Sequence, residues 1–265
     1  MPISIQKNRL WLSQGITAPT FDATGEHLFS VRSADGRTSI VRQNLSTGLT
    51  EIVTAEPAPR GTVGYGGGDY AVLGDLLVYA AEGALVALDL RTGEQRAITP
   101  SYEGAAAPAI APGGRFVAFV IEQDNHADVL LVDTAGKLLP VKLSDSPDFA
   151  ANPTFSPDGD RVAWMEWKVG SMPWEESALR VARLDHPTGE AESPAALLPL
   201  VVGTLAGEHI SYANPQFSPD GSRLAYTSDE SGWRSLYIAN ADGQGGERID
   251  TGAGEIGGPD WAQGQ

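Results

Sequence analysis

Residues 214–221 read Asn-Pro-Gln-Phe-Ser-Pro-Asp-Gly, and residues 152–159 read Asn-Pro-Thr-Phe-Ser-Pro-Asp-Gly. Each stretch runs directly into an alternating apolar segment, residues 223–226 after the first and residues 161–164 after the second. In the shared Ser-Pro-Asp-Gly, proline restricts φ, aspartate can bond to its own backbone, and glycine accepts a positive φ. The stretch therefore predicts a tight hairpin between two strands, made at least twice along the chain.

Weaker copies of this stretch extend the repeat over most of the chain. Residues 18–25 and 107–114 keep the Ala-Pro start and the closing glycine, residues 70–74 hold a degenerate copy, and residues 258–261 begin another. The turn glycines lie 49, 40, 45 and 62 residues apart, at Gly25, Gly74, Gly114, Gly159 and Gly221. Three of these intervals are close to the length of one propeller blade.

One repeat has room for four strands. After residue 217 the pattern indicates strands at residues 224–228, 235–239 and 248–250, with turns between them. A four-stranded sheet cannot bury both faces alone, whereas copies stacked radially bury them against one another. We therefore expect an all-β propeller of about five four-stranded blades plus the start of a sixth. A jelly roll or sandwich would show no such repeat.

The whole chain, residues 1–265, is expected to form a single propeller domain. The approximate blades are residues 16–57, 64–100, 105–144, 148–203 and 208–251, with a partial blade at 255–262. The longest interval is assigned to inserted residues in the ranges 164–174 and 185–197. The sequence leaves two alternatives for the ring. It is closed by residues 3–5 and 9–13 pairing beside residues 256–261, or it is open.

Composition excludes several classes of function. The chain has 34 acidic and 18 basic residues, a formal net charge of -16, so its average field repels nucleic acid and anionic membranes. It has no cysteine, which excludes disulfides and thiolate metal sites. Lys7 and Arg9 interrupt the apolar residues at the start, so no signal peptide is expected. We expect a cytoplasmic protein without a cofactor.

Histidines and glycines give no sign of metal or phosphate binding. The histidines are scattered without His-x-x-x-His spacing, at His27, His126, His186 and His209. The glycine-rich residues 64–68 lack the Lys-Ser/Thr of a phosphate-binding loop, so they indicate close approach of two backbones at a strand entry.

Three segments carry a resemblance to a known family. They are the glycine-rich residues 60–70, the Trp-rich residues 164–179 with Met172-Pro173-Trp174-Glu175, and residues 215–237. Together they resemble the N-terminal β-propeller of the prolyl oligopeptidase family of serine peptidases, in its acylaminoacyl-peptidase and dipeptidyl-peptidase-like branch. The family usually has a His-Pro pair before Met172, where this chain has residues 168–171.

The resemblance implies a propeller that caps an α/β-hydrolase domain and gates the entry of short peptides. The hydrolase carries its serine in a Gly-x-Ser-x-Gly elbow, and this chain has no such motif. We therefore expect no catalytic residue in this chain and a non-catalytic gating role, in a truncated product of a longer gene. The expected partners are an α/β-hydrolase domain or short peptides.

Two other functions remain open. One is a free-standing, TolB-like or WD-repeat-like propeller that binds a protein partner. The other is a propeller glycosidase or lactonase, which needs acidic residues at the starts of its inner strands. Those entries are uncharged, namely Ala18, Ala107, Asn152 and Asn214.

Four residues of the Trp-rich segment are candidates for contact with peptide or hydrolase. Trp167, Met172 and Trp174 are large apolar side chains on an expected insertion, and Glu175 could pair with a substrate amine. The alternatives are packing between blades for the aromatic residues and simple solvation for the carboxylate.

Overall fold

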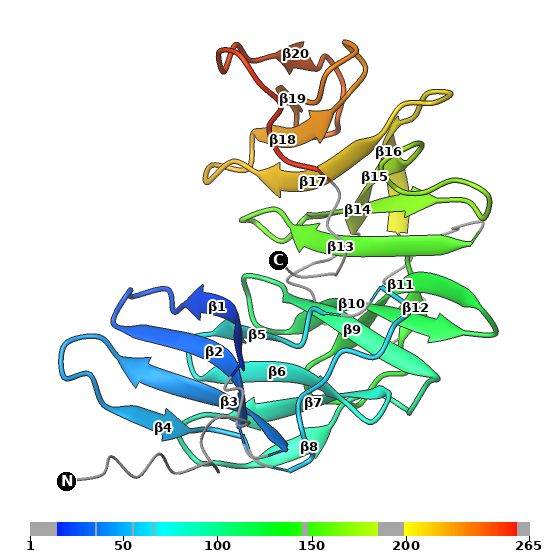
Figure 1. The fold of residues 1–265 in the computed structure, drawn as a ribbon. Helices are drawn as coiled ribbons and strands as arrows, with labels where there is room; N and C mark the ends of the chain where they lie inside the picture. The colour runs from blue at the N-terminus through cyan, green and yellow to red at the C-terminus, as the bar shows by residue number, and fades with distance from the viewer. Residues whose placement is uncertain are drawn as a thin grey trace, which may run out of the picture.

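The computed structural model describes residues 15–34, 36–54, 56–65, 67–144, 148–184 and 199–258. In these ranges the chain forms no helix, and its strands assemble into five four-stranded sheets, as Figure 1 shows. The predicted all-β propeller of about five blades is confirmed. We number the sheets 1 to 5 in chain order.

The strands follow the expected fourfold rhythm. Sheet 1 contains β1 (Gly15–Phe21), β2 (His27–Ala34), β3 (Arg37–Asn44) and β4 (Thr50–Ile52). Sheet 2 contains β5 (Tyr70–Leu73), β6 (Leu76–Ala81), β7 (Ala84–Asp89) and β8 (Gln95–Ala97). Sheet 3 contains β9 (Gly104–Ile110), β10 (Phe116–Gln123), β11 (His126–Asp133) and β12 (Val141–Lys142). Sheet 4 contains β13 (Phe149–Phe155), β14 (Arg161–Trp167), β15 (Ala178–Leu184) and β16 (Pro199–Leu205). Sheet 5 contains β17 (Tyr212–Phe217), β18 (Arg223–Ser228), β19 (Ser235–Asn240) and β20 (Glu247–Arg248).

Each sheet is an antiparallel meander whose strands pair in chain order. Because neighbouring strands are antiparallel, the first and third strands of a sheet begin at the same rim. We call this the entry rim, since the chain enters each inner strand there. The opposite rim carries the Ser-Pro-Asp-Gly turns, and we call it the hairpin rim.

The turns have the geometry that their residues predict. Gly159 and Gly221 adopt φ values of 75° and 70°. In the second turn, Ser218 Oγ donates to Asp220 Oδ1 at 2.6 Å, and the same carboxylate accepts the N–H of Ser222 at 3.0 Å. Local chemistry therefore reverses the chain, and the tertiary structure only has to stack the resulting sheets.

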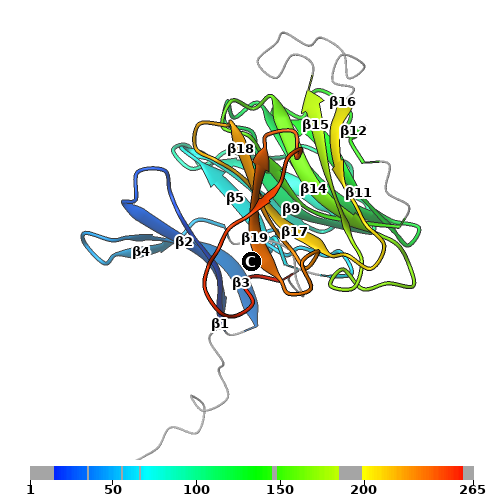
Figure 2. The ribbon, with the colours of Figure 1, turned by 90° about the horizontal axis from the view of Figure 1, so that it is seen from above.

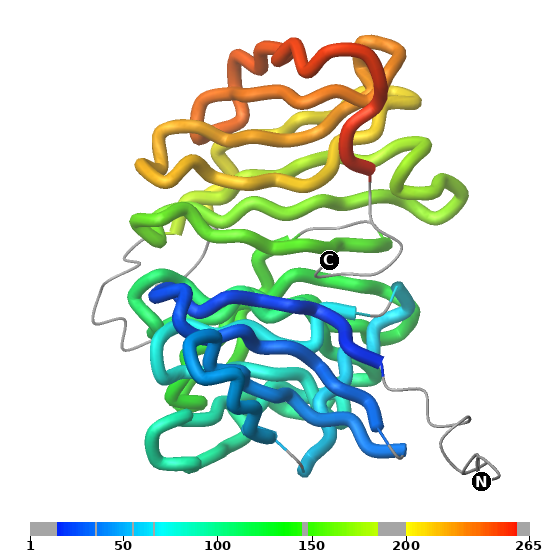
Figure 3. Tube along the Cα trace, turned by 60° about the vertical axis from the view of Figure 1, so that its left-hand side comes forward, coloured from blue at the N-terminus to red at the C-terminus, as the bar shows by residue number. Residues whose placement is uncertain are grey.

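The sheets stack as a curved series that runs from blue to red in Figures 1 and 3. Buried apolar side chains fill the junctions between sheets 1 and 2, 2 and 3, 3 and 4, and 4 and 5. Among the described residues, no buried cluster joins sheet 5 to sheet 1. Figure 2 shows sheet 1 lying to one side of the other sheets.

The outward face of sheet 1 exposes several apolar side chains. The strand pairing places Phe21 opposite Leu28, and Ile52 opposite Val41, on the face turned away from sheet 2. Phe21 and Ile52 are 63% and 67% exposed. This face has no neighbouring sheet in the described part of the chain.

The structure corrects one part of the expected insertion. Trp164 to Trp167 belong to β14, so the long connection on the entry rim begins only after them and spans residues 168–177. The second expected insertion, residues 185–197, lies outside the described residues, as do residues 3–5, 9–13 and 259–262 of the expected ring closure and partial blade.

Candidate functional site

The inner strands share a backbone irregularity at the propeller axis. In four sheets the residue before a proline adopts a positive φ of 50° to 55° and the strand pairing slips there; these residues are Ala18, Ala107, Asn152 and Asn214. Sheet 2 has Gly68, with a φ of 62°, just before its inner strand. A β-bulge of this kind turns the backbone of each inner strand at one level along the axis.

An axial cavity lies where these bulges meet. Its volume is about 280 Å³, and its lining combines small or proline residues with uncharged polar ones. The polar lining side chains are Tyr70, Asn152, Thr154, Asn214 and Gln216. Among the described residues that line this cavity there is no carboxylate, so the described inner-strand entries carry none of the acidic groups that a propeller glycosidase or lactonase requires.

Hydrogen bonds between adjacent sheets surround the axis. The Tyr70 hydroxyl donates to the carbonyl oxygen of Ala18 at 2.7 Å, and the Ala107 N–H donates to the carbonyl oxygen of Gly68 at 2.7 Å. Asn214 Nδ2 donates to the carbonyl oxygen of Gly258 at 3.0 Å. Burial raises the pKa of Tyr70 to about 12, so its hydroxyl keeps its proton at neutral pH.

Gly68 explains the glycine-rich segment. A Cβ atom at this position would lie 2.6 Å from the backbone nitrogen of Ala107 in the next sheet. The predicted close approach of two backbones is confirmed, and the segment makes a junction between sheets 2 and 3.

The long connection 168–177 closes on itself at the entry rim of sheet 4. The Met172 N–H donates to Glu175 Oε2 at 2.9 Å, and the Glu175 N–H donates to the Met172 carbonyl at 2.8 Å. Met172 is 44% exposed, Glu175 is exposed and Trp174 is half-buried. The fold therefore brings three of the four predicted contact residues together at one rim.

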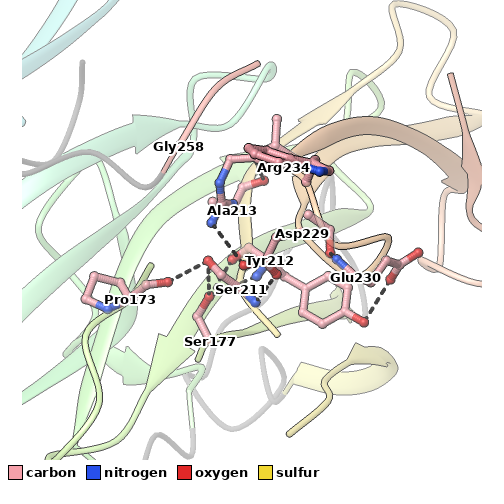
Figure 4. A network of polar contacts seen from close by, with 12 residues as sticks. Pro173, Ser177, Ser211, Tyr212, Ala213, Asp229, Glu230, Arg234 and Gly258 are labelled. Atoms are coloured by element: carbon pink, nitrogen blue, oxygen red, sulfur yellow. Dashed lines mark hydrogen bonds and ion pairs between the residues drawn. The ribbon is translucent and has the colours of Figure 1, made fainter. Parts of the chain in front are cut away.

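A buried polar network anchors this connection to sheet 5 (Figure 4). Ser211 Oγ donates to the Pro173 carbonyl at 2.7 Å, and Ser177 Oγ donates to the Tyr212 carbonyl at 2.8 Å. The Ser211 N–H donates to Asp229 Oδ1 at 2.8 Å. Because these groups are buried, each bond avoids an unsatisfied polar atom, and the position of the connection follows the position of sheet 5.

Acidic side chains flank the network on the same rim. Tyr212 donates its hydroxyl to Glu230 Oε2 at 3.0 Å, and Glu176 Oε2 accepts the N–H of His209 at 3.0 Å. Burial, with Glu230 as a second cause, raises the pKa of Tyr212 above its ordinary value. This rim therefore offers carboxylates beside aromatic surface, an arrangement that can attract a cationic or amine-bearing group.

Trp167 lies in the interior and is only 5% exposed. Its ring stacks on Phe149 at a centroid distance of 5.2 Å and meets Tyr65 edge-on at 5.0 Å. The structure thus joins two of the segments that carry the family resemblance, because Tyr65 belongs to the glycine-rich one. Trp167 therefore lies in the interior where the connection 168–177 begins. Contact between Trp167 and a peptide remains a prediction.

A second cavity of about 280 Å³ opens beside the connection. Its wall includes Glu166, which accepts Trp164 Nε1–H at 2.7 Å and Arg180 Nε–H at 2.8 Å. Glu166 is 3% exposed, so its charge is balanced inside the sheet by Arg180.

Sequence reasoning missed the axial bulges and the Glu166–Arg180 pair. A signal for the bulges was present, because Ala-Pro or Asn-Pro opens four of the repeats. No local signal identifies the ion pair, since it depends on the register of β14 and β15.

Within the described ranges, no three His, Asp or Glu side chains gather to hold a metal ion. Those ranges also contain no helix with the length and hydrophobicity that a membrane-spanning helix needs.

Solved structures show the same fold. No family model matches the chain. A puromycin hydrolase structure is similar over 95% of this chain, with a TM-score of 0.75 and 24% identity, and this chain spans 41% of that protein. The match with a prolyl endopeptidase structure covers 90% of this chain and 36% of the endopeptidase chain, with a TM-score of 0.60 and 14% identity.

TolB from Acinetobacter baumannii is also similar. It matches 87% of this chain with a TM-score of 0.57 and 20% identity, over 53% of its own length. The chain spans about two fifths of the puromycin hydrolase and about half of this TolB. The resemblance to peptidase propellers is therefore confirmed in the fold, which this chain shares with a puromycin hydrolase, a prolyl endopeptidase and TolB.

Proposed function

We propose that this chain is the non-catalytic, substrate-gating propeller portion of a serine peptidase of the prolyl oligopeptidase kind. The observation that carries the proposal is the entry rim of sheets 4 and 5. There the connection 168–177 presents Met172, Trp174 and Glu175 and is held by buried hydrogen bonds. The similarity to a puromycin hydrolase over 95% of this chain supports it.

The rim has the chemistry for a short peptide. Its carboxylates can pair with a free α-amino group, and half-buried or exposed apolar side chains can contact the peptide side chains. The axial cavity of about 280 Å³ is lined by neutral groups. A gate of this composition would admit small, uncharged portions of a chain and exclude folded proteins by size.

The test has two steps on the purified chain. Chromogenic acyl-amino-acid and dipeptide substrates should give no turnover, and hydrolysis that survives purification would contradict the non-catalytic role. Calorimetric titration with short peptides should then show weak binding that Trp174→Ala reduces by tenfold or so, about 1.4 kcal/mol.

The matched control for the rim is Leu139→Ala. Leu139 is 73% exposed in the connection between β11 and β12, on the hairpin rim. The Leu139→Ala substitution should leave the peptide affinity unchanged. Equal affinities for wild type, Trp174→Ala and Leu139→Ala would remove the rim from the proposal.

The second candidate is a free-standing propeller that binds a protein partner, and the similarity to TolB favours it. The two candidate functions differ in whether the outward faces of the end sheets need a neighbouring sheet to cover them. Light scattering after size-exclusion chromatography should show self-association if the exposed face of sheet 1 needs a neighbour, and a stable monomer favours the free-standing module.

A further inference from the structure

The second cavity, beside the connection 168–177, has no role in the gate as proposed so far. It lies at the entry ends of the strands of sheet 4, between residues that end β14, residues that begin β15 and residues 206–207, which follow β16. Its volume of about 280 Å³ is close to the lower limit of about 300 Å³ for pockets that hold small molecules. The charged side chains among its described lining residues are Glu166, Lys168, Glu176 and Arg180. These charges decide which ligand the cavity fits.

Glu166 and Arg180 form a balanced ion pair that has donors to spare. Both carboxylate oxygens of Glu166 are occupied, one by Trp164 Nε1–H at 2.7 Å and the other by Arg180 Nε–H at 2.8 Å. The Arg180 Nη1 group also donates to Thr204 Oγ1 at 2.8 Å. A guanidinium carries five N–H groups, and the bonds of Arg180 to described residues use two of them. Since Glu166 is only 3% exposed, the pair offers a ligand donors rather than acceptors.

Lys168 is a cation with no acidic partner among the described residues. Its side chain is exposed, and its carbonyl oxygen accepts the Ser171 N–H at 3.3 Å. The next residue, Val169, donates its N–H to Asp148 Oδ2 at 2.8 Å. The backbone on both sides of Lys168 is therefore fixed beside the cavity, while no described residue accepts a bond from its ammonium group.

Glu176 favours a different ligand, an amine, because its side chain is 38% exposed and can accept a further bond. Its Oε2 accepts the His209 N–H at 3.0 Å and lies 3.8 Å from Nδ1 of the same histidine. The free N–H groups of Lys168 and Arg180 outnumber the acceptors that Glu176 can still offer. The cavity therefore fits a group rich in acceptors better than an amine. A carboxylate is such a group, and its bonds to lysine and arginine are charge-assisted and strong.

We propose that this cavity binds a carboxylate of a short peptide, with Lys168 and Arg180 as the donors. The inference rests on the proposed function for the class of ligand, and on the charges of the lining for the place where it binds. The chain has a formal net charge of -16, so its average field repels an anion, and binding of a carboxylate needs local cations that outweigh this field. The carboxylates of the rim suit the amino group of the same peptide, so the cavity fixes which end of the peptide enters it.

Calorimetric titration of the full chain tests the proposal with three N-acetylated probes, which have no free amine. The first is N-acetyl-trialanine with a free carboxylate, the second is its C-terminal amide, and the third is the amide of N-acetyl-Ala-Glu-Ala. The free acid should bind about tenfold more tightly than the plain amide, because only the acid makes charge-assisted bonds. The third probe separates the two sources of a carboxylate, since the tighter of the two acidic probes identifies a terminal or a side-chain group. Equal affinities for all three probes overturn the proposal.

Lys168→Met assigns the preference to this cavity, because methionine keeps most of the length of the side chain and removes its charge. In this variant the preference for the acidic probe should fall to about twofold or less. The matched control is Lys137→Met, which removes the same charge from an exposed turn on the hairpin rim and should keep the full preference. Arg180 stays in place, since its loss would leave Glu166 buried without a partner. A preference that survives Lys168→Met overturns the assignment.

The same titrations separate a failure of this site from a failure of the gate. If the acid and the amide bind equally, and Trp174→Ala weakens both, peptide binding at the rim stands and the carboxylate site is wrong. If no probe binds, the carboxylate site and peptide binding at the rim fail together.

Discussion

The junction between sheets 2 and 3 and the junction between sheets 4 and 5 solve the same packing problem with different chemistry. The first is built of aliphatic side chains and Phe119, with Val78, Leu85 and Val117 all 0% exposed. The second combines apolar side chains with stacked tyrosines and buried serines, among them Ser177 and Ser211.

The difference follows from what each junction supports. Between sheets 2 and 3, the irregular residues 60–68 are held by backbone groups: the Thr62 N–H donates to the Ala105 carbonyl at 3.0 Å, and the Ala107 N–H donates to the Gly68 carbonyl at 2.7 Å. Sheets 4 and 5 also hold the long connection 168–177, whose buried carbonyl groups need donors. Buried serine side chains supply these donors in the junction beneath the candidate site, whereas backbone groups hold the irregular segment beside sheets 2 and 3.

The largest expected effect is in the apolar junction. Phe119→Ala should destabilise the protein by about 3–5 kcal/mol, because Phe119 is 0% exposed and the substitution leaves a cavity. Chemical denaturation measures the change. Leu45→Ala is the control, since Leu45 is 45% exposed in a turn, and it should cost less than about 0.5 kcal/mol. Similar losses for the two variants would mean that this junction contributes little stability.

The next effect tests the backbone contact at the axis. Gly68→Ala should cost about 3 kcal/mol, since the new Cβ meets the Ala107 backbone and the residue has a φ of 62°. Gly93→Ala shares the positive φ, at 77°, but has nothing within 4 Å of the added Cβ, so it should cost only about 1 kcal/mol. Equal unfolding free energies for the two variants would show that the close approach is not tight.

A smaller effect is expected in the polar junction. Ser211→Ala removes the donor to the Pro173 carbonyl and should cost about 1–3 kcal/mol, because that carbonyl becomes unsatisfied. Hydrogen exchange should quicken in residues 171–177 and stay unchanged in β6 and β10. Exposed Ser46→Ala is the control. Unchanged exchange in the connection would refute the anchoring role of Ser211.

The smallest expected effect is on the stability of one hairpin at low pH. The hydrogen bond from Ser218 is the main reason that the pKa of Asp220 falls to about 2, below its ordinary 3.8. A carboxyl whose folded pKa is depressed stabilises the fold above its unfolded pKa and loses that contribution as the pH falls from about 4 toward 2. The hairpin of sheet 5 should therefore open in this range before the hairpin of sheet 3, whose turn is Pro112-Gly113-Gly114 and has no carboxylate.

Asp220→Asn separates this cause from general acid unfolding. Hydrogen exchange of β17 and β18 between pH 4 and pH 2 should become less dependent on pH in the variant than in the wild type. Ser218→Ala should act in the same direction, since it removes the first cause of the shift. An unchanged pH dependence in both variants would rule out this carboxylate as the source.

Much of the fold was predictable, because its signals are local. The hairpins at Gly159 and Gly221 depend on proline, aspartate and glycine within four residues, and the strands after them depend on alternation. The expectation that residues 64–68 bring two backbones together also held, since glycine spacing points to close approach. The blade limits stay a prediction.

The candidate site was less predictable. The sequence left the Trp-rich segment with two interpretations, contact residues or packing between blades. Trp167 ends β14 inside the aromatic cluster and so packs, while Met172 and Glu175 lie on the rim. The strand β14 also continues beyond Trp164 to Trp167, where the spacing had assigned an insertion. Side-chain exposure here depends on where a strand ends, and element ends are set by neighbouring sheets.

By itself, the sequence determined that this protein is a repeated series of antiparallel hairpins, because each reversal is specified by residues adjacent in the chain. Only the tertiary structure decided which residues meet at the axis, which junction is polar and which aromatic side chains are buried. Those outcomes depend on pairs such as Gly68 with Ala107 or Tyr65 with Trp167, which are far apart in the chain. Their contact is set by the stacking of whole sheets, which no local pattern encodes.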